Sequence, residues 1–323
     1  MKAVYGPVAS WRLGLSLGID PILPPKTCSF NCVYCQLGET EVKIGSPKEF
    51  KPRLTVRQLL KELKEASNRV DWGKIQHITF SGVGEPTLNP RLARLAEAVK
   101  KSTDKPLAIL TNASTLSDAG VRRGLRFFDL VVAKLDAPTQ ELFEAVNRPA
   151  PGISLNNIVE GLKALRREFS GSLALQIMLY QAEGYPSNSS VKAVEGLAEL
   201  ASEIMPDEVQ VNTPLRPPSQ RFVAPLPFKR LEKLAGIFKS RLPGVKVVYR
   251  RPPEALKPRG LGKPMEAEVL ELIRRRPCRA EEIAEVLEAD FSMVKRCLRG
   301  LVAKGLAEHV KVGGFSFYRV VKA

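Results

Sequence analysis

Residues 28–35 read Cys28-Ser29-Phe30-Asn31-Cys32-Val33-Tyr34-Cys35 and hold three of the five cysteines in this 323-residue chain. Three thiolates on one short loop can each bind a different iron of a [4Fe–4S] cluster, because such clusters are held by cysteine thiolates at short, fixed spacings. The fourth iron then has no ligand from the loop and can take an exogenous one. The spacing therefore favours an iron–sulfur cluster with one open coordination position.

Zinc is the alternative for residues 28–35, which we call the cysteine loop. A structural zinc site takes four ligands, usually completed by a second Cys or His pair at a distance. The other cysteines are Cys278 and Cys297 and the histidines are His77 and His309, and these form no second close pair in the sequence. The iron–sulfur interpretation is therefore favoured over zinc.

Residues 11–215 resemble the radical S-adenosylmethionine superfamily, on the cysteine loop and on the segment Gly82-Val83-Gly84-Glu85-Pro86. This segment is similar to the family's Gly-Gly-Glu element, which contacts the amino group of the cofactor's methionine, although Val83 separates the two glycines. Glycines let the backbone approach a ligand closely, and the Glu85 carboxylate suits an ammonium group. Tyr34 matches the family's aromatic beside the adenine.

The resemblance implies two cofactors, one [4Fe–4S] cluster and S-adenosylmethionine. It makes Cys28, Cys32 and Cys35 the iron ligands, and it implies reductive cleavage of S-adenosylmethionine to a 5′-deoxyadenosyl radical. The cofactors supply the difficult chemistry, while the protein binds and orients them. No separate catalytic residue is assigned.

Polar residues also close the third and fourth predicted strands. Asn112 ends the third, and Lys134 and Asp136 end the fourth. The resemblance implies that all three contact the cofactor, with Lys134 on its carboxylate and Asp136 on a ribose hydroxyl. An internal Lys134–Asp136 ion pair is the alternative, since a buried charge is costly without a partner.

Strand-like apolar segments alternate with amphipathic helical segments over most of the chain. The strand segments are 13–19, 75–80, 107–110, 130–135, 173–179 and 209–212, and the helical segments between them are 55–68, 90–100, 117–126, 139–146, 153–169 and 191–205. This alternation predicts parallel strands with crossover helices. Six such units suit a partial (β/α)6 barrel, as the resemblance also implies, in which function collects at the carboxyl ends of the strands. We predict an α/β fold with a barrel domain over residues 1–250.

The pattern changes after a segment broken by proline and glycine, which we interpret as a basic linker over residues 251–264. Three helical segments follow at 265–275, 280–287 and 291–304, and then a glycine-turned hairpin over 307–321. They resemble a winged helix-turn-helix domain, predicted over residues 265–323. Such a domain can contact nucleic acid or protein.

The net charge of +16 is concentrated in one stretch. Residues 216–263 hold 13 lysines and arginines but 2 acidic residues. A concentrated basic segment is typical of proteins that bind a phosphate backbone, and a solvated linker surface is the alternative.

The sequence also favours a cytoplasmic protein without a membrane segment. It has no apolar run of the roughly 18 residues that a membrane span needs and no apolar leader. Three clustered thiols argue for a reducing compartment.

The segment Ser10–Pro21, followed by the cysteine loop and Gln36-Leu37-Gly38, resembles an iron–sulfur oxidoreductase group related to the wyosine-type tRNA-modifying enzymes. Those enzymes carry a second cluster on upstream cysteines, whereas here no cysteine precedes Cys28. A single cluster is therefore expected, with a separate low-potential donor of the ferredoxin or flavodoxin type. Modification of tRNA or another nucleic acid is the first hypothesis. Radical modification or activation of a protein partner and an iron–sulfur redox-sensing DNA-binding regulator are the alternatives.

Overall fold

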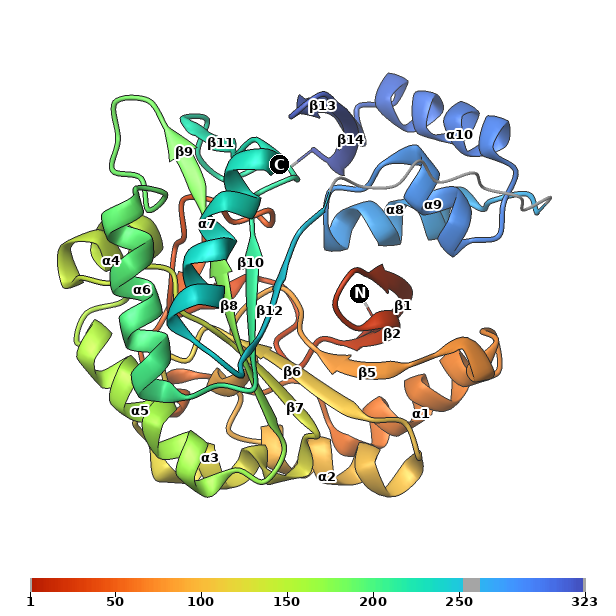
Figure 1. The fold of residues 1–323 in the computed structure, drawn as a ribbon. Helices are drawn as coiled ribbons and strands as arrows, with labels where there is room; N and C mark the ends of the chain where they lie inside the picture. The colour runs from red at the N-terminus through yellow and green to blue at the C-terminus, as the bar shows by residue number, and fades with distance from the viewer. Residues whose placement is uncertain (1, 252–261, 322–323) are drawn as a thin grey trace.

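A computed structural model describes residues 2–251 and 262–321. Its main feature is an eight-stranded sheet in the order β1-β2-β5-β6-β7-β8-β10-β12, curved with helices along its outside (Figure 1). The strands are β1 (Val4–Ser10), β2 (Gly14–Ile19), β5 (His77–Phe80), β6 (Leu107–Thr111), β7 (Leu130–Lys134), β8 (Ser172–Met178), β10 (Glu208–Asn212) and β12 (Lys246–Tyr249). From β2 to β12 all neighbours are parallel, and β1 is antiparallel to β2. The predicted α/β class and the six predicted strands are confirmed.

Crossover helices join successive strands, as the alternating pattern predicted. They are α1 (Val56–Ser67), α2 (Leu92–Ser102), α3 (Ala119–Gly124), α4 (Gln140–Asn147), α5 (Leu155–Glu168), α6 (Val191–Ile204) and α7 (Phe228–Arg241). Helix α1 shows how the sequence sets one of them. The Thr55 side chain caps its first turn by accepting from the Gln58 N–H, and Leu59 and Leu63 bury its inner face.

Strand β1 was not predicted from the sequence. It contains Gly6 and Pro7, which interrupt the alternation expected of a strand, and its register with β2 shifts between Tyr5 and Val8. Proline is tolerated there because β1 lies at the edge of the sheet. Two small sheets were also missed, β3 (Thr27–Cys28) with β4 (Val42–Lys43) and β9 (Tyr180–Ala182) with β11 (Val223–Pro225).

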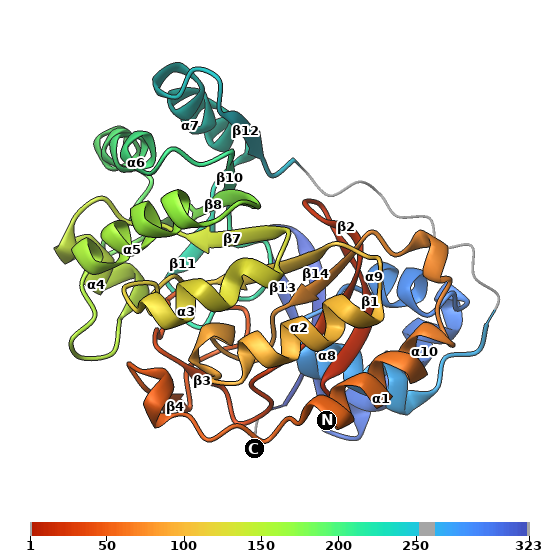
Figure 2. The same ribbon diagram turned by 90° about the horizontal axis from the view of Figure 1, so that it is seen from below.

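Residues 262–321, which we call the C-terminal unit, have a separate hydrophobic core. They contain α8 (Glu266–Arg275), α9 (Ala280–Val286), α10 (Phe291–Ala303) and the antiparallel pair β13 (Ala307–Val312) and β14 (Phe315–Val320). The three helices and the hairpin lie where the sequence predicted them, and the winged helix-turn-helix assignment stays a prediction. Figure 2 shows the unit beside the β1–β2 hairpin. Of the predicted linker, residues 252–261 lie outside the described residues.

The parallel strands bring their carboxyl ends to one edge of the sheet. The cysteine loop follows β2, Gly82–Glu85 follow β5, Asn112 follows β6, and Lys134 ends β7. The fold therefore brings the segments predicted to bind the cofactor to one end of the barrel.

Candidate cluster and cofactor site

The cysteine loop is fixed to the sheet edge by backbone contacts. Cys28 ends β3, Thr27 of β3 bridges to Gly84, and the Glu85 N–H donates to the Thr27 carbonyl at 3.1 Å. Farther along, the Cys35 N–H donates to the Cys32 carbonyl at 3.1 Å and closes a turn. The loop and the Gly82–Glu85 segment, fifty residues apart in the chain, therefore form one structure.

Each of the three thiols has a nitrogen donor within reach. Asn112 Nδ2 lies 3.6 Å from Cys28 Sγ, Asn147 Nδ2 lies 3.4 Å from Cys32 Sγ, and Lys26 Nζ lies 3.2 Å from Cys35 Sγ. Such donors stabilise negative charge on sulfur, and hydrogen bonds to the sulfurs help to set the potential of a bound cluster. Of the three donors, only Asn112 was predicted as a site residue.

Cys28 and Cys32 are held in surroundings that disfavour bare thiolates. Burial raises the pKa of Cys28, and burial followed by the charge of Cys35 raises the pKa of Cys32 to about 11. Bound iron would offset this cost because it supplies positive charge directly at the sulfur. In the described part of the chain, no three Cys, His, Asp or Glu side chains gather round a position for one metal ion. A [4Fe–4S] cluster does not need that convergence, since each thiolate binds its own iron. The three cysteines thus fit a cluster better than a single zinc ion.

Glu85 is buried and heavily bonded. Its Oε1 accepts from the Thr87 N–H and hydroxyl at 3.0 and 2.6 Å and from the Thr111 hydroxyl at 2.7 Å, while Oε2 accepts from the Asn112 N–H at 2.6 Å. Burial raises the pKa of Glu85, and these donors oppose the rise. The carboxylate joins the ends of β5 and β6, and Oε2, with its single donor, keeps the capacity to accept another hydrogen bond.

Glycine is required at both positions of this segment because neighbouring protein atoms leave no space for a Cβ. A Cβ on Gly84 would lie 1.8 Å from the Thr27 carbonyl oxygen, and one on Gly82 would lie 2.0 Å from Asp20 Oδ1. Both positions therefore exclude any side chain. The sequence explained these glycines by close approach of a ligand, whereas the structure shows that the backbone of the cysteine-loop strand and the Asp20 side chain approach them.

Three further predicted residues, Asn112, Lys134 and Asp136, line a small cavity next to the loop. Its walls are Phe30, Asn112, Lys134, Leu135, Asp136, Phe143, Asn147, Leu155 and Ile158. Lys134 Nζ lies 3.6 Å from Asp136 Oδ2 and 4.8 Å from the centre of the Tyr34 ring. It is buried and has no hydrogen-bond partner among the described residues. The internal ion pair considered from the sequence is present, and the ammonium keeps unused donors.

Asp136 organises this cavity. The Tyr34 hydroxyl donates to its Oδ2, Asn147 Nδ2 donates to the same oxygen at 3.0 Å, and the Met178 N–H donates to Oδ1 at 2.8 Å. Burial, followed by the charge of Asp136, raises the pKa of Tyr34 well above its usual value. The tyrosine is therefore a neutral donor held in one orientation. The structure brings all of the predicted site residues to the barrel end.

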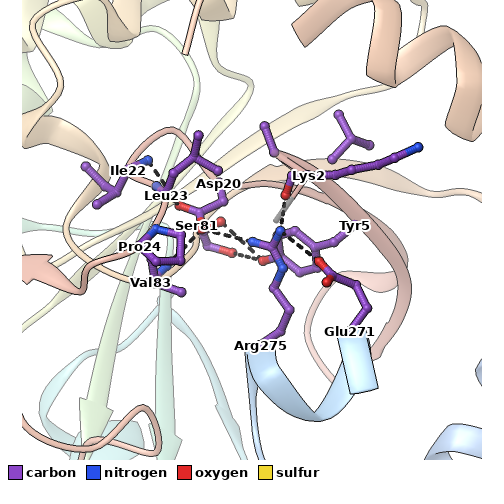
Figure 3. Close-up of polar contacts among 12 residues, drawn as sticks. Lys2, Tyr5, Asp20, Ile22, Leu23, Pro24, Ser81, Val83, Glu271 and Arg275 are labelled. Atoms are coloured by element: carbon purple, nitrogen blue, oxygen red, sulfur yellow. Dashed lines mark hydrogen bonds and ion pairs between the residues drawn. The ribbon is translucent and has the colours of Figure 1, made fainter. Parts of the chain in front are cut away.

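Asp20 is a site residue that sequence reasoning missed (Figure 3). Its Oδ1 accepts from the Ile22 and Leu23 N–H groups at 3.0 and 3.1 Å, and its Oδ2 accepts from the Val83 N–H at 3.4 Å. One carboxylate thus links the approach to the cysteine loop with the Gly82–Glu85 segment. The only sequence signal was its position directly after β2.

Arg275 of α8 completes this arrangement from the C-terminal unit. Its Nη1 lies 2.9 Å from Asp20 Oδ2, and its guanidinium carbon lies 4.5 Å from the centre of the Tyr5 ring (Figure 3). Nη2 also donates to the Lys2 carbonyl. The Arg275 side chain is 4% exposed and that of Asp20 is 0% exposed. Burial raises the pKa of Asp20, and the Arg275 charge opposes that rise.

Comparison with known proteins agrees with this geometry. The sequence profile of the Radical SAM superfamily matches residues 22–183. The UPF0026 protein slr1464 of Synechocystis sp. is 44% identical over 220 residues, which cover 68% of this chain and 78% of that protein. A UPF0026 protein of Helicobacter pylori strain J99 is 31% identical over 98% of this chain and 97% of its own length.

A more distant relative is the dual-specificity RNA methyltransferase RlmN of Lawsonia intracellularis. It is 25% identical over 55% of this chain and 49% of that protein. Among solved structures, a radical SAM methyltransferase from Sphaerobacter thermophilus matches with a TM-score of 0.53 and 17% identity, over 73% of this chain and 65% of that one. Streptococcus suis SuiB bound to S-adenosylmethionine matches with a TM-score of 0.51 and 14% identity, over 73% of this chain and 47% of that one. These likenesses concern the fold.

No helix in the described ranges is long and apolar enough to cross a membrane. The cysteine loop, the parallel barrel sheet and the matched profile agree with one another. The chain belongs to the Radical SAM superfamily of enzymes, whose members use a [4Fe–4S] cluster and S-adenosylmethionine.

Proposed function

We propose that this enzyme carries one [4Fe–4S] cluster on Cys28, Cys32 and Cys35 and modifies an RNA, with tRNA as the first candidate. The observation that carries the cluster assignment is the pairing of each thiol with its own nitrogen donor, at 3.6, 3.4 and 3.2 Å. These donors suit a cofactor that places negative charge on all three sulfurs. When bound, the reduced cluster and S-adenosylmethionine supply carbon–sulfur cleavage and the 5′-deoxyadenosyl radical.

The protein's part is to hold the amino-acid end of S-adenosylmethionine beside the loop. We assign the carboxylate of S-adenosylmethionine to Lys134, because the buried side-chain ammonium of Lys134 has unused hydrogen-bond donors. We assign the ammonium group of S-adenosylmethionine to Glu85 Oε2. Gly82 and Gly84 keep the backbone tight at this position, and Asn112 connects Glu85 to Cys28. Each assignment uses an atom with hydrogen-bonding capacity left.

Tyr34 and Asp136 form the other wall of the proposed cofactor site. Asp136 already accepts from three donors, so its first role is to fix the Tyr34 ring. A ribose hydroxyl bonded to Asp136 would share an oxygen with these donors. We place the adenine beside this oriented, buried ring.

We infer that electrons come from a separate protein of the ferredoxin or flavodoxin type. The two cysteines outside the loop, Cys278 and Cys297, lie in the C-terminal unit, where Cys278 is buried. They offer no cysteine cluster for a second iron–sulfur centre. A low-potential donor and free thiols suit a reducing, cytoplasmic location.

The RNA assignment is supported by charge and by one relative. The chain carries a net charge of +16, and the RlmN relative is named as an RNA methyltransferase. The basic stretch is less uniform than the sequence suggested, because Arg216 is bonded to Glu282 and Lys246 to Glu208. Lys257 and Arg259 lie outside the described residues. Superfamily membership favours an enzyme over the redox-sensing regulator.

The substrate class is tested in cells lacking the gene. Digested RNA from these cells and from cells complemented with the wild type or with Cys32→Ala is compared by mass spectrometry. We expect one modified nucleoside to disappear and to return only with the wild type. Unchanged nucleosides together with an altered peptide mass would transfer the proposal to a protein substrate.

A further inference from the structure

Five arginines and three aromatic residues lie close together between the two edge strands of the barrel sheet, β1 and β12. Arg12 lies on the β1–β2 turn, Arg250 follows β12, and α9 packs on β1 (Figures 1 and 2). We call this group the arginine–aromatic cluster, and its members are Trp11, Arg12, Arg216, Arg250, Arg276, Arg279, Phe315 and Phe317. Because β1 and β12 are the outer strands of the sheet order, the cluster lies across the open side of the barrel.

Four of the five arginines in this cluster lie next to an aromatic ring. The guanidinium carbons of Arg12 and Arg250 each lie 5.6 Å from the centre of a ring of Trp11. Arg279 lies 5.6 Å from the ring of Phe315, on the hairpin of the C-terminal unit. Trp11 and Phe315 are half-buried, so part of each ring remains accessible.

Positive charge in the cluster exceeds its negative charge. Glu282 is used by Arg216, with hydrogen bonds of 2.9 and 2.7 Å. Within residues 2–251 and 262–321, no carboxylate forms an ion pair with Arg12, Arg250 or Arg276. Arg12 Nη1 has only the neutral Gln210 at 3.4 Å, and its buried Nε has no hydrogen-bond partner among these residues.

The crowding of like charges is costly. Burial, followed by the charge of Arg250, lowers the pKa of Arg12 to about 10. Burial and Arg216 lower the pKa of Arg250 to about 10. A bound anion would offset this cost, since a neighbouring opposite charge favours the charged form of a guanidinium.

We propose that the arginine–aromatic cluster binds a single-stranded segment of the RNA substrate, an inference that rests on the proposed function. Guanidinium groups match phosphate oxygens in bidentate geometry. Unpaired bases stack on aromatic side chains and arginine planes with little dependence on sequence. The surface thus fits both parts of an unpaired RNA strand.

The test measures binding of bulk tRNA and of a single-stranded RNA oligonucleotide to the full chain by fluorescence anisotropy at several salt concentrations. The cluster variant is Arg12→Gln/Arg250→Gln. The matched control is Lys229→Gln/Lys233→Gln, which removes the same charge from exposed positions on α7 in the same basic stretch. Loss of two phosphate contacts should make the slope of log K against log salt shallower by roughly 1.4 on a single strand. The control should change it by less than half as much.

Trp11→Ala provides a second readout that does not depend on charge. Losing one stacked base should weaken binding about 5- to 150-fold with an unchanged salt slope. Circular dichroism and iron content check the fold of each variant, and Arg250→Lys, which keeps the charge, should retain most of the slope.

The outcomes separate this inference from the proposed function. If the wild type binds RNA but the cluster variant and Trp11→Ala bind as tightly as the control, the cluster is not the RNA surface. If the wild type binds no RNA and instead binds an acidic polypeptide, the RNA assignment itself fails, and this inference fails with it.

Discussion

Arg275→Met should loosen the cofactor end of the barrel from a position on α8. The substitution leaves the buried Asp20 carboxylate without its ion-pair partner, and it also removes the bond to the Lys2 carbonyl and the contact with the Tyr5 ring. Removing one partner of a buried pair costs about 3–5 kcal/mol, because the remaining charge stays buried. With 4% and 0% exposure of the two side chains, solvent offers little relief.

The effect should appear where Asp20 holds the backbone. Hydrogen-exchange mass spectrometry of the protein without cofactors should show faster exchange in peptides covering Ile22, Leu23 and Val83. The backbone N–H groups of these residues donate hydrogen bonds to the Asp20 carboxylate. The expected loss in opening free energy is about 3–5 kcal/mol, limited by the stability of the whole barrel. Arg274→Met, at an exposed position on the same helix, is the matched control and should leave this exchange unchanged.

The pH dependence has a defined sign. Burial raises the pKa of Asp20 and Arg275 opposes the rise, so the pKa climbs further in Arg275→Met. A group with a raised pKa in the folded state loses stabilisation as pH rises through that pKa. The loss of stability in Arg275→Met, relative to the wild type, should therefore be largest at neutral pH and shrink in acid, where Asp20 is protonated. Asp20→Asn should partly rescue Arg275→Met, since it removes the unpaired charge. Unchanged exchange in Arg275→Met, or no rescue by the second substitution, would refute this reasoning.

Three further predictions concern the site itself. Glu85→Gln should keep the iron content but weaken S-adenosylmethionine binding about tenfold or more, because a charge-assisted hydrogen bond of about 1.5–3 kcal/mol is lost. Equilibrium dialysis of the reconstituted protein measures this affinity, and an unchanged affinity would remove Glu85 from the site. Gly84→Ala should reduce both soluble yield and iron content, because its Cβ would lie 1.8 Å from the Thr27 carbonyl oxygen. Gly236→Ala is the control, because a Cβ there has open space around it. Equal iron content in the two variants would contradict the packing argument. Cys297→Ser should leave iron content and cluster absorbance unchanged, and a loss of iron would mean that the cluster uses a ligand outside the cysteine loop.

The sequence predicted the parts of the fold that local patterns encode. Apolar runs located each central strand, and amphipathic spacing located the helices between them. The three cysteines and Glu85 could be found because their spacing carries chemistry by itself. Strand β1 could not, since Gly6-Pro7 removes its alternation while pairing with β2 supplies the hydrogen bonds.

The missed residues act through contacts between distant positions. Asn147 meets Cys32 across 115 positions of the chain, and Arg275 meets Asp20 across 255. No periodicity or spacing signals such a pair. Arg216 shows a limit of counting charges along the sequence, because this residue of the basic stretch is bonded to Glu282.

The most direct measurement of the central claim is anaerobic reconstitution of the full chain, followed by iron analysis and assay of 5′-deoxyadenosine after reduction with dithionite. We predict about four irons per chain, as one [4Fe–4S] cluster requires, and formation of 5′-deoxyadenosine from S-adenosylmethionine. Cys28→Ala, Cys32→Ala and Cys35→Ala should each abolish both. Iron near eight per chain, or 5′-deoxyadenosine that persists in Cys32→Ala, would contradict a single radical-generating cluster on the cysteine loop.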